Sequence, residues 1–216
     1  SHLGEGAEIE TEQLAAIMIE LQSRGCHNIN LVTPTHVVPQ MLEALLLAVE
    51  NGLTIPIVYN SGGYDRVETL QLLRGIIDIY MPDFKFWNKE WADRYCSAPD
   101  YKDVAVSALK EMHAQVGDLK IDGNDIARSG LLIRHLVMPD GISGTKEVME
   151  FLSKEISENT YVNVMDQYRP CGTAYTDTHI NRRVSSEEYL QALKWAESAG
   201  LRRLDQRKGL RLLFRI

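Results

Sequence analysis

Polar side chains stand at the ends of five β-rich runs in this sequence. The groups that could do chemistry there are Thr33-Pro34-Thr35, Asn60-Ser61, Asp83 with Lys85, Arg134, and Tyr168. In parallel α/β barrels the carboxyl ends of the strands share one open rim, so we expect these groups to converge. They include no Ser/His/Asp order and no metal-spaced His/Cys cluster. They therefore favour binding of a polar, zwitterionic ligand over hydrolysis.

Asp83 and Lys85 alternate along an extended segment, and this pair is open to three interpretations. The two side chains could form a solvated strand end, as charged residues usually do. They could also bind the charged groups of a ligand. A lysine at such a rim could instead be a Schiff-base nucleophile if burial favoured its neutral form.

Arg134 interrupts an otherwise apolar strand at 130–138. A buried arginine needs a carboxylate or phosphate partner, so we predict a binding role for it. His135 points to the opposite face of the same strand. We expect it to be a hydrogen-bonded packing residue rather than a ligand.

The elements that must position these groups follow from the hydrophobic periodicity. Five β-rich runs alternate with stretches of helical spacing, and the runs are residues 28–35, 54–60, 76–81, 130–138 and 160–165. This alternation is typical of a parallel sheet with crossover helices. Ser185 and Glu188 form a capping box at the start of the last helix. A turn-rich segment at 122–125 predicts a small β-excursion or loop.

Composition indicates one ordinary domain. The chain has 216 residues, of which 44% are hydrophobic and 25% charged. We expect a barrel domain over residues 1–200, followed by an arginine-rich surface tail at 201–216. The net charge of -7 is spread along the chain and indicates no nucleic-acid or anionic membrane partner. No run approaches the roughly 18 apolar residues that span a bilayer, so we expect a cytoplasmic protein.

The three cysteines, Cys26, Cys96 and Cys171, lie about 70 residues apart. This spacing fits neither a zinc site nor a redox dithiol, and an odd number argues against a disulfide framework. We therefore expect separate thiols in a reducing compartment, and no metal site built from these residues.

Five segments carry a family resemblance. They read SHLGEG at 1–6, NINLVTPTH at 28–36, DIYMPDFK at 78–85, RHLVMP at 134–139 and MDQYRP at 165–170. In this order they resemble radical S-adenosylmethionine proteins of the pyruvate formate-lyase activating enzyme type, over almost the whole chain. The resemblance implies a partial TIM-type (β/α)6 barrel with parallel strands, in which five strands are present and the first strand is missing.

The resemblance also implies roles for residues near the first two strands. In the family, a glycine-rich motif on the first of these strands meets the methionine amino group of the cofactor through its backbone. Thr33-Pro34-Thr35 stands in its place here, which is a departure from Gly-Gly-Glu. Asn60 and Ser61 correspond to residues near the ribose and the methionyl group.

The remaining strand ends match the family as follows. Asp83 and Lys85 match an Asp-x-Lys element whose lysine approaches the cofactor carboxylate as a point charge. Arg134 falls at a strand arginine of the activating enzymes. Tyr168 occupies the neighbourhood of a histidine in other members, which is a second departure.

The implied cofactors are S-adenosylmethionine and a 4Fe-4S cluster. The family holds its cluster through three cysteines spaced C-x3-C-x2-C, just before the segment that begins here with Ser1-His2. No such motif occurs in the 216 residues. A cluster needs thiolate ligands, so they are expected upstream of Ser1 and the chain as written is expected to be inactive.

The implied activity is that of a complete enzyme in which a reduced cluster cleaves the cofactor into methionine and a 5′-deoxyadenosyl radical. The expected substrate is a glycine in a partner glycyl radical enzyme, and the expected electron donor is a flavodoxin or ferredoxin. Two alternatives stay open: a barrel lyase or aldolase that uses Lys85 as a Schiff-base nucleophile, and a degenerate barrel that only binds a protein partner.

Overall fold

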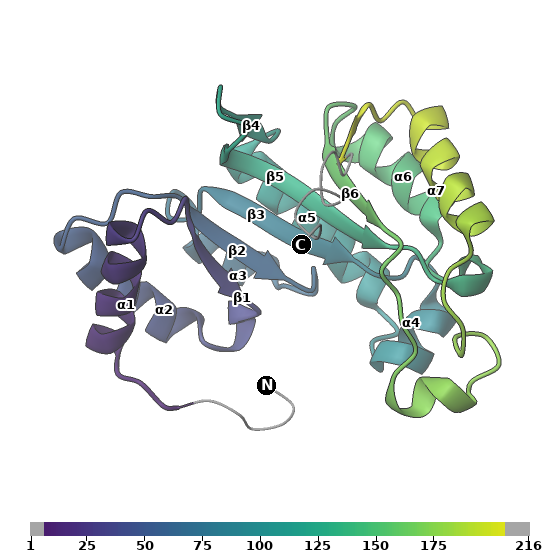
Figure 1. The fold of residues 1–216 in the computed structure, drawn as a ribbon, viewed down its shortest axis with the longest axis horizontal. Helices are drawn as coiled ribbons and strands as arrows, with labels where there is room; N and C mark the ends of the chain where they lie inside the picture. Colours follow the sequence, from purple (N-terminus) through teal and green to yellow (C-terminus); the bar gives the residue numbers. More distant parts are fainter. Residues whose placement is uncertain (1–6, 206–216) are drawn as a thin grey trace, which may run out of the picture.

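The computed structural model describes residues 7–205, which form an open parallel sheet flanked by helices (Figure 1). The strands are β1 (Ile29–Val32), β2 (Ile57–Ser61), β3 (Ile79–Phe84), β4 (Lys120–Ile121), β5 (Ala127–Leu136), β6 (Tyr161–Met165) and β7 (Arg203–Leu204). Within this part of the chain six strands run parallel in the order β1-β2-β3-β5-β6-β7, and β4 pairs antiparallel with β5. The expected parallel α/β fold of a partial barrel is confirmed.

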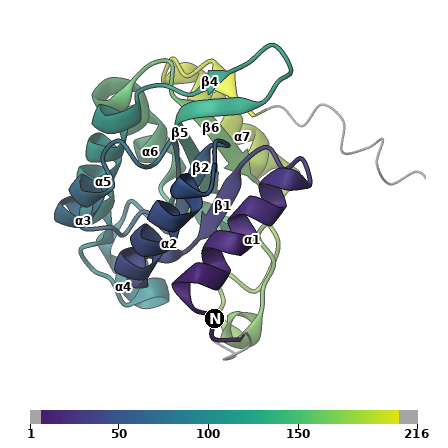
Figure 2. The same cartoon turned by 90° about the vertical axis from the view of Figure 1, so that its left-hand side faces the viewer.

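One helix precedes β1, and helices connect most of the parallel strands, with two of them between β3 and β4. The helices are α1 (Thr11–Ser23), α2 (Val38–Glu50), α3 (Val67–Leu72), α4 (Lys89–Cys96), α5 (Tyr101–Val116), α6 (Thr145–Phe151) and α7 (Ser186–Ser198). Short 3-10 turns η1 (Pro34–His36), η2 (Pro139–Gly141) and η4 (Gly172–Thr176) lie in loops, and a π-helical turn η3 (Leu152–Ile156) extends α6. In Figure 1 the sheet fans from α1 and α2 at one end to α6 and α7 at the other. Figure 2 shows α1 and α2 in front of β1.

The sheet has two faces with different cores. Tyr59 and Tyr80 point toward the helices and belong to the main core. Their neighbours Val58 and Ile79 point the other way, because side chains alternate along a strand, and pack with Leu119 in a small second core. We call this second face the inner face. It is apolar near the amino ends of the strands, where the β4–β5 hairpin contributes Leu119 next to β4.

Two boundaries differ from those expected. The third run was expected to break at Pro82, yet β3 continues through Asp83 to Phe84. Proline removes only one donor, and the next two residues still pair in register with Arg134 and His135 of β5.

The chain end also differs from the expectation. β7 pairs with β6 inside the segment expected to be a surface tail, and Leu201 is buried. The sheet thus extends beyond the expected boundary at residue 200. Residues 206–216 of that predicted tail lie outside the described residues. Among the helices of residues 7–205, none has the length and apolarity needed to cross a bilayer.

Candidate functional site

Three polar side chains from neighbouring strands meet on the inner face of the sheet. Arg134 donates from Nε to Oδ1 of Asp83 at 2.8 Å, and its Nη2 lies 2.6 Å from the same oxygen. The same Nη2 donates to Oδ1 of Asn60 at 2.9 Å. The Arg134 side chain is only 27% exposed, and a largely buried arginine requires a carboxylate partner. Asp83 is that partner.

Lys85 follows directly after β3 and adds a second cation. Its Nζ lies 3.6 Å from Oδ2 of Asp83, and the lysine side chain is 43% exposed. The two oxygens of Asp83 thus face different cations, Arg134 on one side and Lys85 on the other. This arrangement presents positive groups to an anion, and the carboxylate remains available to a ligand ammonium group.

A buried tyrosine and a glycine fix the backbone beneath these charges. The Tyr101 hydroxyl accepts from the Lys85 N–H at 2.9 Å and lies within 3.0 Å of the carbonyls of Gly62 and Asp83, to which it can donate. Burial raises the pKa of Tyr101, so the hydroxyl stays a donor. Gly63 has φ +74°, and a Cβ there would lie 2.2 Å from the Asp83 carbonyl oxygen. The loop after β2 and the end of β3 are therefore tightly apposed.

Two of the expected binding residues serve a buried carboxylate instead. Asp65 is 1% exposed and accepts at Oδ1 from the hydroxyls of Thr35 at 2.8 Å and Tyr59 at 3.0 Å. Ser61 donates to its Oδ2 at 2.6 Å. Burial raises the pKa of Tyr59, and the nearby Asp65 raises it further. This cluster ties the loops after β1 and β2 together.

The first strand end has a strained backbone. Thr33 adopts the left-handed region with φ 54° and ψ 50°, which is unusual for a β-branched residue. Its N–H donates to the Asn60 carbonyl at 2.7 Å. Pro34 is buried at the start of η1.

One cavity of about 1170 Å³ opens at the carboxyl ends of β3, β5 and β6. Four of the expected residues line it, namely Asp83, Lys85, Arg134 and Tyr168. Thr33, Pro34, Thr35, Asn60 and Ser61 are not on its wall. Asn60 nevertheless contributes to the site, because it hydrogen-bonds Arg134. The expected site residues thus include some that line the cavity and one that holds a lining residue in place.

Tyr168 lies in the long segment that follows β6. Its hydroxyl donates to the Ile180 carbonyl at 2.7 Å, which closes the segment on itself. Burial is the main cause that raises the pKa of this tyrosine. Because the proton is committed to that carbonyl, Tyr168 offers the cavity its ring and an acceptor oxygen.

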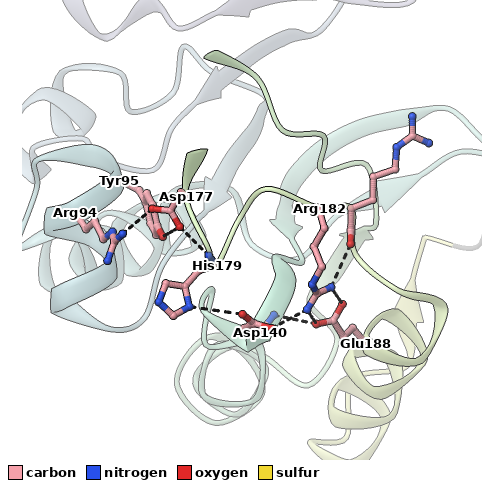
Figure 3. A network of polar contacts seen from close by, with 8 residues as sticks. Arg94, Tyr95, Asp140, Asp177, His179, Arg182 and Glu188 are labelled. Carbon is pink, nitrogen blue, oxygen red and sulfur yellow. Dashed lines mark hydrogen bonds and ion pairs between the residues drawn. The ribbon is translucent and has the colours of Figure 1, made fainter. Parts of the chain in front are cut away.

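Polar contacts that the sequence did not indicate anchor this segment (Figure 3). Arg94 of α4 binds the Asp177 carboxylate at 2.7 Å, and Tyr95 donates to it at 3.2 Å. The His179 backbone N–H is the main cause that lowers the pKa of Asp177, and Arg94 lowers it further. No local pattern in the sequence indicates this pairing, since the partners lie 83 residues apart.

A second anchor joins the segment to α7. Arg182 binds Glu188 with both Nη atoms at 2.8 Å and binds Asp140 at 2.6 Å. The Arg182 guanidinium is the main cause that lowers the pKa of Glu188 to about 2. Glu188 also completes the expected capping box with Ser185, with hydrogen bonds of 2.8 and 3.1 Å. The capping prediction is confirmed, but the ion pair was not foreseen.

His135 is a packing residue, as expected. It is fully buried, its Nδ1 lies 2.8 Å from the Phe84 carbonyl, and its Nε2 lies 2.9 Å from the Thr145 hydroxyl. A carbonyl only accepts, so Nδ1 carries the proton and Nε2 accepts from Thr145. Burial lowers the pKa of His135 to about 4. The neutral ring locks β5 to β3 and α6 on the face away from the cavity.

Two of the three cysteines lie at the cavity, whereas no metal site occurs in the part of the chain that the structure describes. Within residues 7–205, no group of three or more His, Cys, Asp or Glu side chains could hold a metal ion. Cys96 and Cys171 both line the cavity, although nothing in their spacing associates them. Burial raises the pKa of Cys96, and the nearby Lys85 opposes this effect.

No protein-family model matches the sequence. It is 37% identical over 177 residues to an uncharacterised protein of Methanocaldococcus jannaschii, an alignment that covers 81% of this chain and 47% of that protein. The chain thus spans about half the length of the curated relative it matches.

A solved structure shares the fold. A domain of a pyruvate-formate lyase-activating enzyme from Bacteroides vulgatus superposes with a TM-score of 0.57 over 81% of this chain and 94% of that domain, at 15% sequence identity. This similarity establishes a common α/β architecture. The chain therefore has the fold of a pyruvate-formate lyase-activating enzyme domain.

Proposed function

We propose that this chain is the cofactor-binding barrel of a radical S-adenosylmethionine enzyme of the pyruvate formate-lyase activating type. The observation that carries the proposal is the pairing of Asp83 with Arg134 and Lys85 on the wall of one cavity, with Asn60 hydrogen-bonded to Arg134. The similarity in fold to a domain of such an enzyme supports it.

The residues present fit S-adenosylmethionine. The ligand carries a carboxylate, an ammonium group and a sulfonium, and the site offers two cations around one carboxylate. Lys85 and Arg134 would bind the ligand carboxylate, and Asp83 would face its ammonium group. When bound, the cofactor supplies a 5′-deoxyadenosyl group for radical chemistry. The chain itself binds and orients the ligand, and the segment after β6 excludes water.

The residues present do not fit a 4Fe-4S cluster. Such a cluster is held by cysteine thiolates, and no suitable group of ligands occurs among residues 7–205. The sequence of 216 residues contains only the three dispersed cysteines. The proposal therefore requires cluster ligands from outside this sequence.

The substrate and partners are proposed by analogy with the family. The substrate would be a glycine backbone position of a glycyl radical enzyme, and a flavodoxin or ferredoxin would supply the electron. Fold and cofactor do not determine the substrate, so this part of the proposal needs its own test. A cytoplasmic location, expected from the composition of the sequence, is proposed as well.

The aldolase alternative is not favoured by the geometry. A Schiff-base lysine is activated by burial or by a neighbouring cation. The Lys85 ammonium instead lies 3.6 Å from a carboxylate, and the side chain is 43% exposed. Covalent trapping of Lys85 by borohydride with a carbonyl substrate would revive that alternative. Failure of the wild-type protein to bind S-adenosylhomocysteine would favour the other alternative, a barrel that only binds a protein partner.

Calorimetric titration of the full-length protein with S-adenosylhomocysteine tests the proposal. Lys85→Ala should weaken binding by about 1 to 3 kcal/mol, the scale of a lost charge-assisted hydrogen bond, or roughly 5- to 150-fold in Kd. Lys154→Ala is the matched control, because Lys154 is 71% exposed and pairs within its own helical segment. An affinity that is unchanged in Lys85→Ala would remove Lys85 from the site.

A further inference from the structure

Asp65 is a buried carboxylate that does not line the cavity. It is 1% exposed and accepts from the hydroxyls of three residues, Thr35 at 2.8 Å, Tyr59 at 3.0 Å and Ser61 at 2.6 Å. Hydrogen bonds to an ionised carboxylate are about twice as strong as those between neutral groups. A buried carboxylate that loses such donors is destabilised by more than the bond alone, so Asp65 fixes the three residues that donate to it.

Two of these donors flank Asn60 on β2. Tyr59 and Ser61 are its neighbours in the chain, and side chains alternate along a strand, so both point to the face opposite Asn60. Asp65 therefore holds β2 from the side of the main core, to which Tyr59 belongs. Asn60, on the inner face, accepts from Nη2 of Arg134 at 2.9 Å. A shift of β2 at this point would move the Asn60 oxygen away from the guanidinium.

A second path leads from Asp65 to the other partner of Arg134, which is Asp83. The Ser61 hydroxyl donates its proton to Asp65 and accepts from the Gly63 N–H at 3.2 Å. Gly63 lies against the Asp83 carbonyl, where an added Cβ would stand 2.2 Å from the oxygen. The loop after β2 is held against the end of β3 in this way, so the place of Asp83 also depends on the buried carboxylate.

The third donor fixes the end of β1. Thr33 has the left-handed φ of 54°, and its N–H donates to the Asn60 carbonyl at 2.7 Å. A strained conformation of this kind persists only where the surrounding contacts compensate for it. The hydrogen bond from Thr35 to Asp65, two residues further on, is one such contact. The ends of β1, β2 and β3 are thus joined through one carboxylate.

We infer that Asp65 is a positioning residue, which holds Asn60 and Asp83 at the spacing that the Arg134 guanidinium bridges. Arg134 donates to acceptors on two different strands, so its orientation depends on the distance between them. The inference deepens the proposed function and rests on it where the ligand is concerned. A guanidinium that is already held in one orientation binds a carboxylate without first losing side-chain freedom, so loss of Asp65 should weaken ligand binding.

Hydrogen exchange at the Arg134 Nε–H tests the inference without any ligand. This N–H donates to Asp83 at 2.8 Å, so its proton should be protected from exchange with water. The full-length protein is labelled with 15N at the arginine Nε, and the Arg134 signal is identified by its loss in Arg134→Lys.

Asp65→Asn is the variant to compare with wild type. Asparagine keeps the shape of the side chain, but its NH2 group cannot accept from a hydroxyl. Exchange at Arg134 should become at least about fivefold faster, the fold-change that corresponds to one lost hydrogen bond. An unchanged rate in the folded variant would overturn the inference.

Asp118→Asn is the matched control. The Asp118 carboxylate also accepts from a hydroxyl, that of Ser157 at 3.1 Å, and its Oδ1 lies 3.0 Å from Nε2 of His113. It stands just before β4, near the amino ends of the strands, so the same change of charge there should leave exchange at Arg134 unchanged. An increase as large as that in Asp65→Asn would overturn the inference, because it would reflect a general loss of stability.

A second variant makes the same test if Asp65→Asn does not fold. Ser61→Ala removes one of the three hydroxyl donors and also the oxygen that accepts from the Gly63 N–H. Exchange at Arg134 should again become at least about fivefold faster. An unchanged rate in this variant would equally overturn the inference.

S-adenosylhomocysteine separates this inference from the proposed function. In calorimetric titration it should bind folded Asp65→Asn at least about fivefold more weakly than wild type, and Asp118→Asn as tightly as wild type. If wild type binds the ligand while Asp65→Asn changes neither exchange nor affinity, the inference fails and the cofactor site stands. If wild type does not bind it while exchange at Arg134 becomes faster in Asp65→Asn, the proposed cofactor fails and the positioning of Arg134 stands.

Discussion

Replacing Gly63 by alanine, and comparing it with a matched glycine, should separate two contributions to the loss of stability: backbone conformation and close packing at the site. Gly63 is buried, has φ +74° and would place a Cβ 2.2 Å from the Asp83 carbonyl oxygen. Gly75 is the matched control, since its φ is +79° and nothing lies within 4 Å of the same added atom. Both variants meet the same conformational penalty, and only Gly63→Ala must also displace a strand.

The expected magnitudes follow from these two terms. A left-handed conformation costs an alanine about 1–2 kcal/mol, and the stiffer unfolded chain offsets about 0.4–1 kcal/mol of this. Gly75→Ala should therefore lose about 1 kcal/mol of unfolding free energy. Gly63→Ala should lose about 1–3 kcal/mol more, the usual cost of forcing extra atoms into a packed site.

Urea denaturation followed by circular dichroism measures this difference. The two folded variants are also titrated with S-adenosylhomocysteine. A displaced Asp83 backbone would move the end of β3, so binding should weaken in Gly63→Ala alone. Losses of stability that agree within about 0.5 kcal/mol for the two variants would refute the argument that the Gly63 contact positions Asp83.

Three further changes test separate parts of the structure. Thr33→Gly should raise the unfolding free energy by up to about 1 kcal/mol in urea, because glycine relieves the left-handed strain, and a clear loss would show that the threonine side chain is needed. Tyr101→Phe should lower stability by about 1–3 kcal/mol and also weaken S-adenosylhomocysteine binding, since Lys85 N–H loses its acceptor; a loss of stability with full affinity would leave Tyr101 a structural role only. Burial lowers the pKa of His135 from 6.5 to about 4, so the unfolded chain takes up this proton first and stability should fall by up to about 3 kcal/mol as pH drops from 6.5 to 4. His135→Gln should flatten that part of the pH profile, and an unchanged slope would assign the acid sensitivity to other groups.

Local sequence patterns predicted the elements well where periodicity was strong. The capping box of α7 was expected at the position found, and the alternation of strands and helices correctly indicated a parallel sheet. The errors lie where local signals are weak. Pro82 was expected to end its strand, and β7 is only two residues long inside an arginine-rich segment.

The candidate site was only partly predictable. Strand ends and residue types were enough to select Asp83, Lys85 and Arg134, because parallel strands bring their carboxyl ends to one rim. They did not distinguish these from Thr35 and Ser61, which have similar positions and bind the buried Asp65 instead. A short polar side chain next to a buried carboxylate cannot be told from one at an open cavity by its sequence neighbours.

By itself, the sequence determined the order of strands and helices and the polar residue types at the strand ends, since both depend on neighbours a few positions away. The tertiary structure decided which of those residues meet. Arg134 reaches Asp83 and Asn60 across 51 and 74 residues of chain, and Arg94 reaches Asp177 across 83. Contacts of this kind depend on strand register and on how a long loop folds back, and local periodicity carries no information about either.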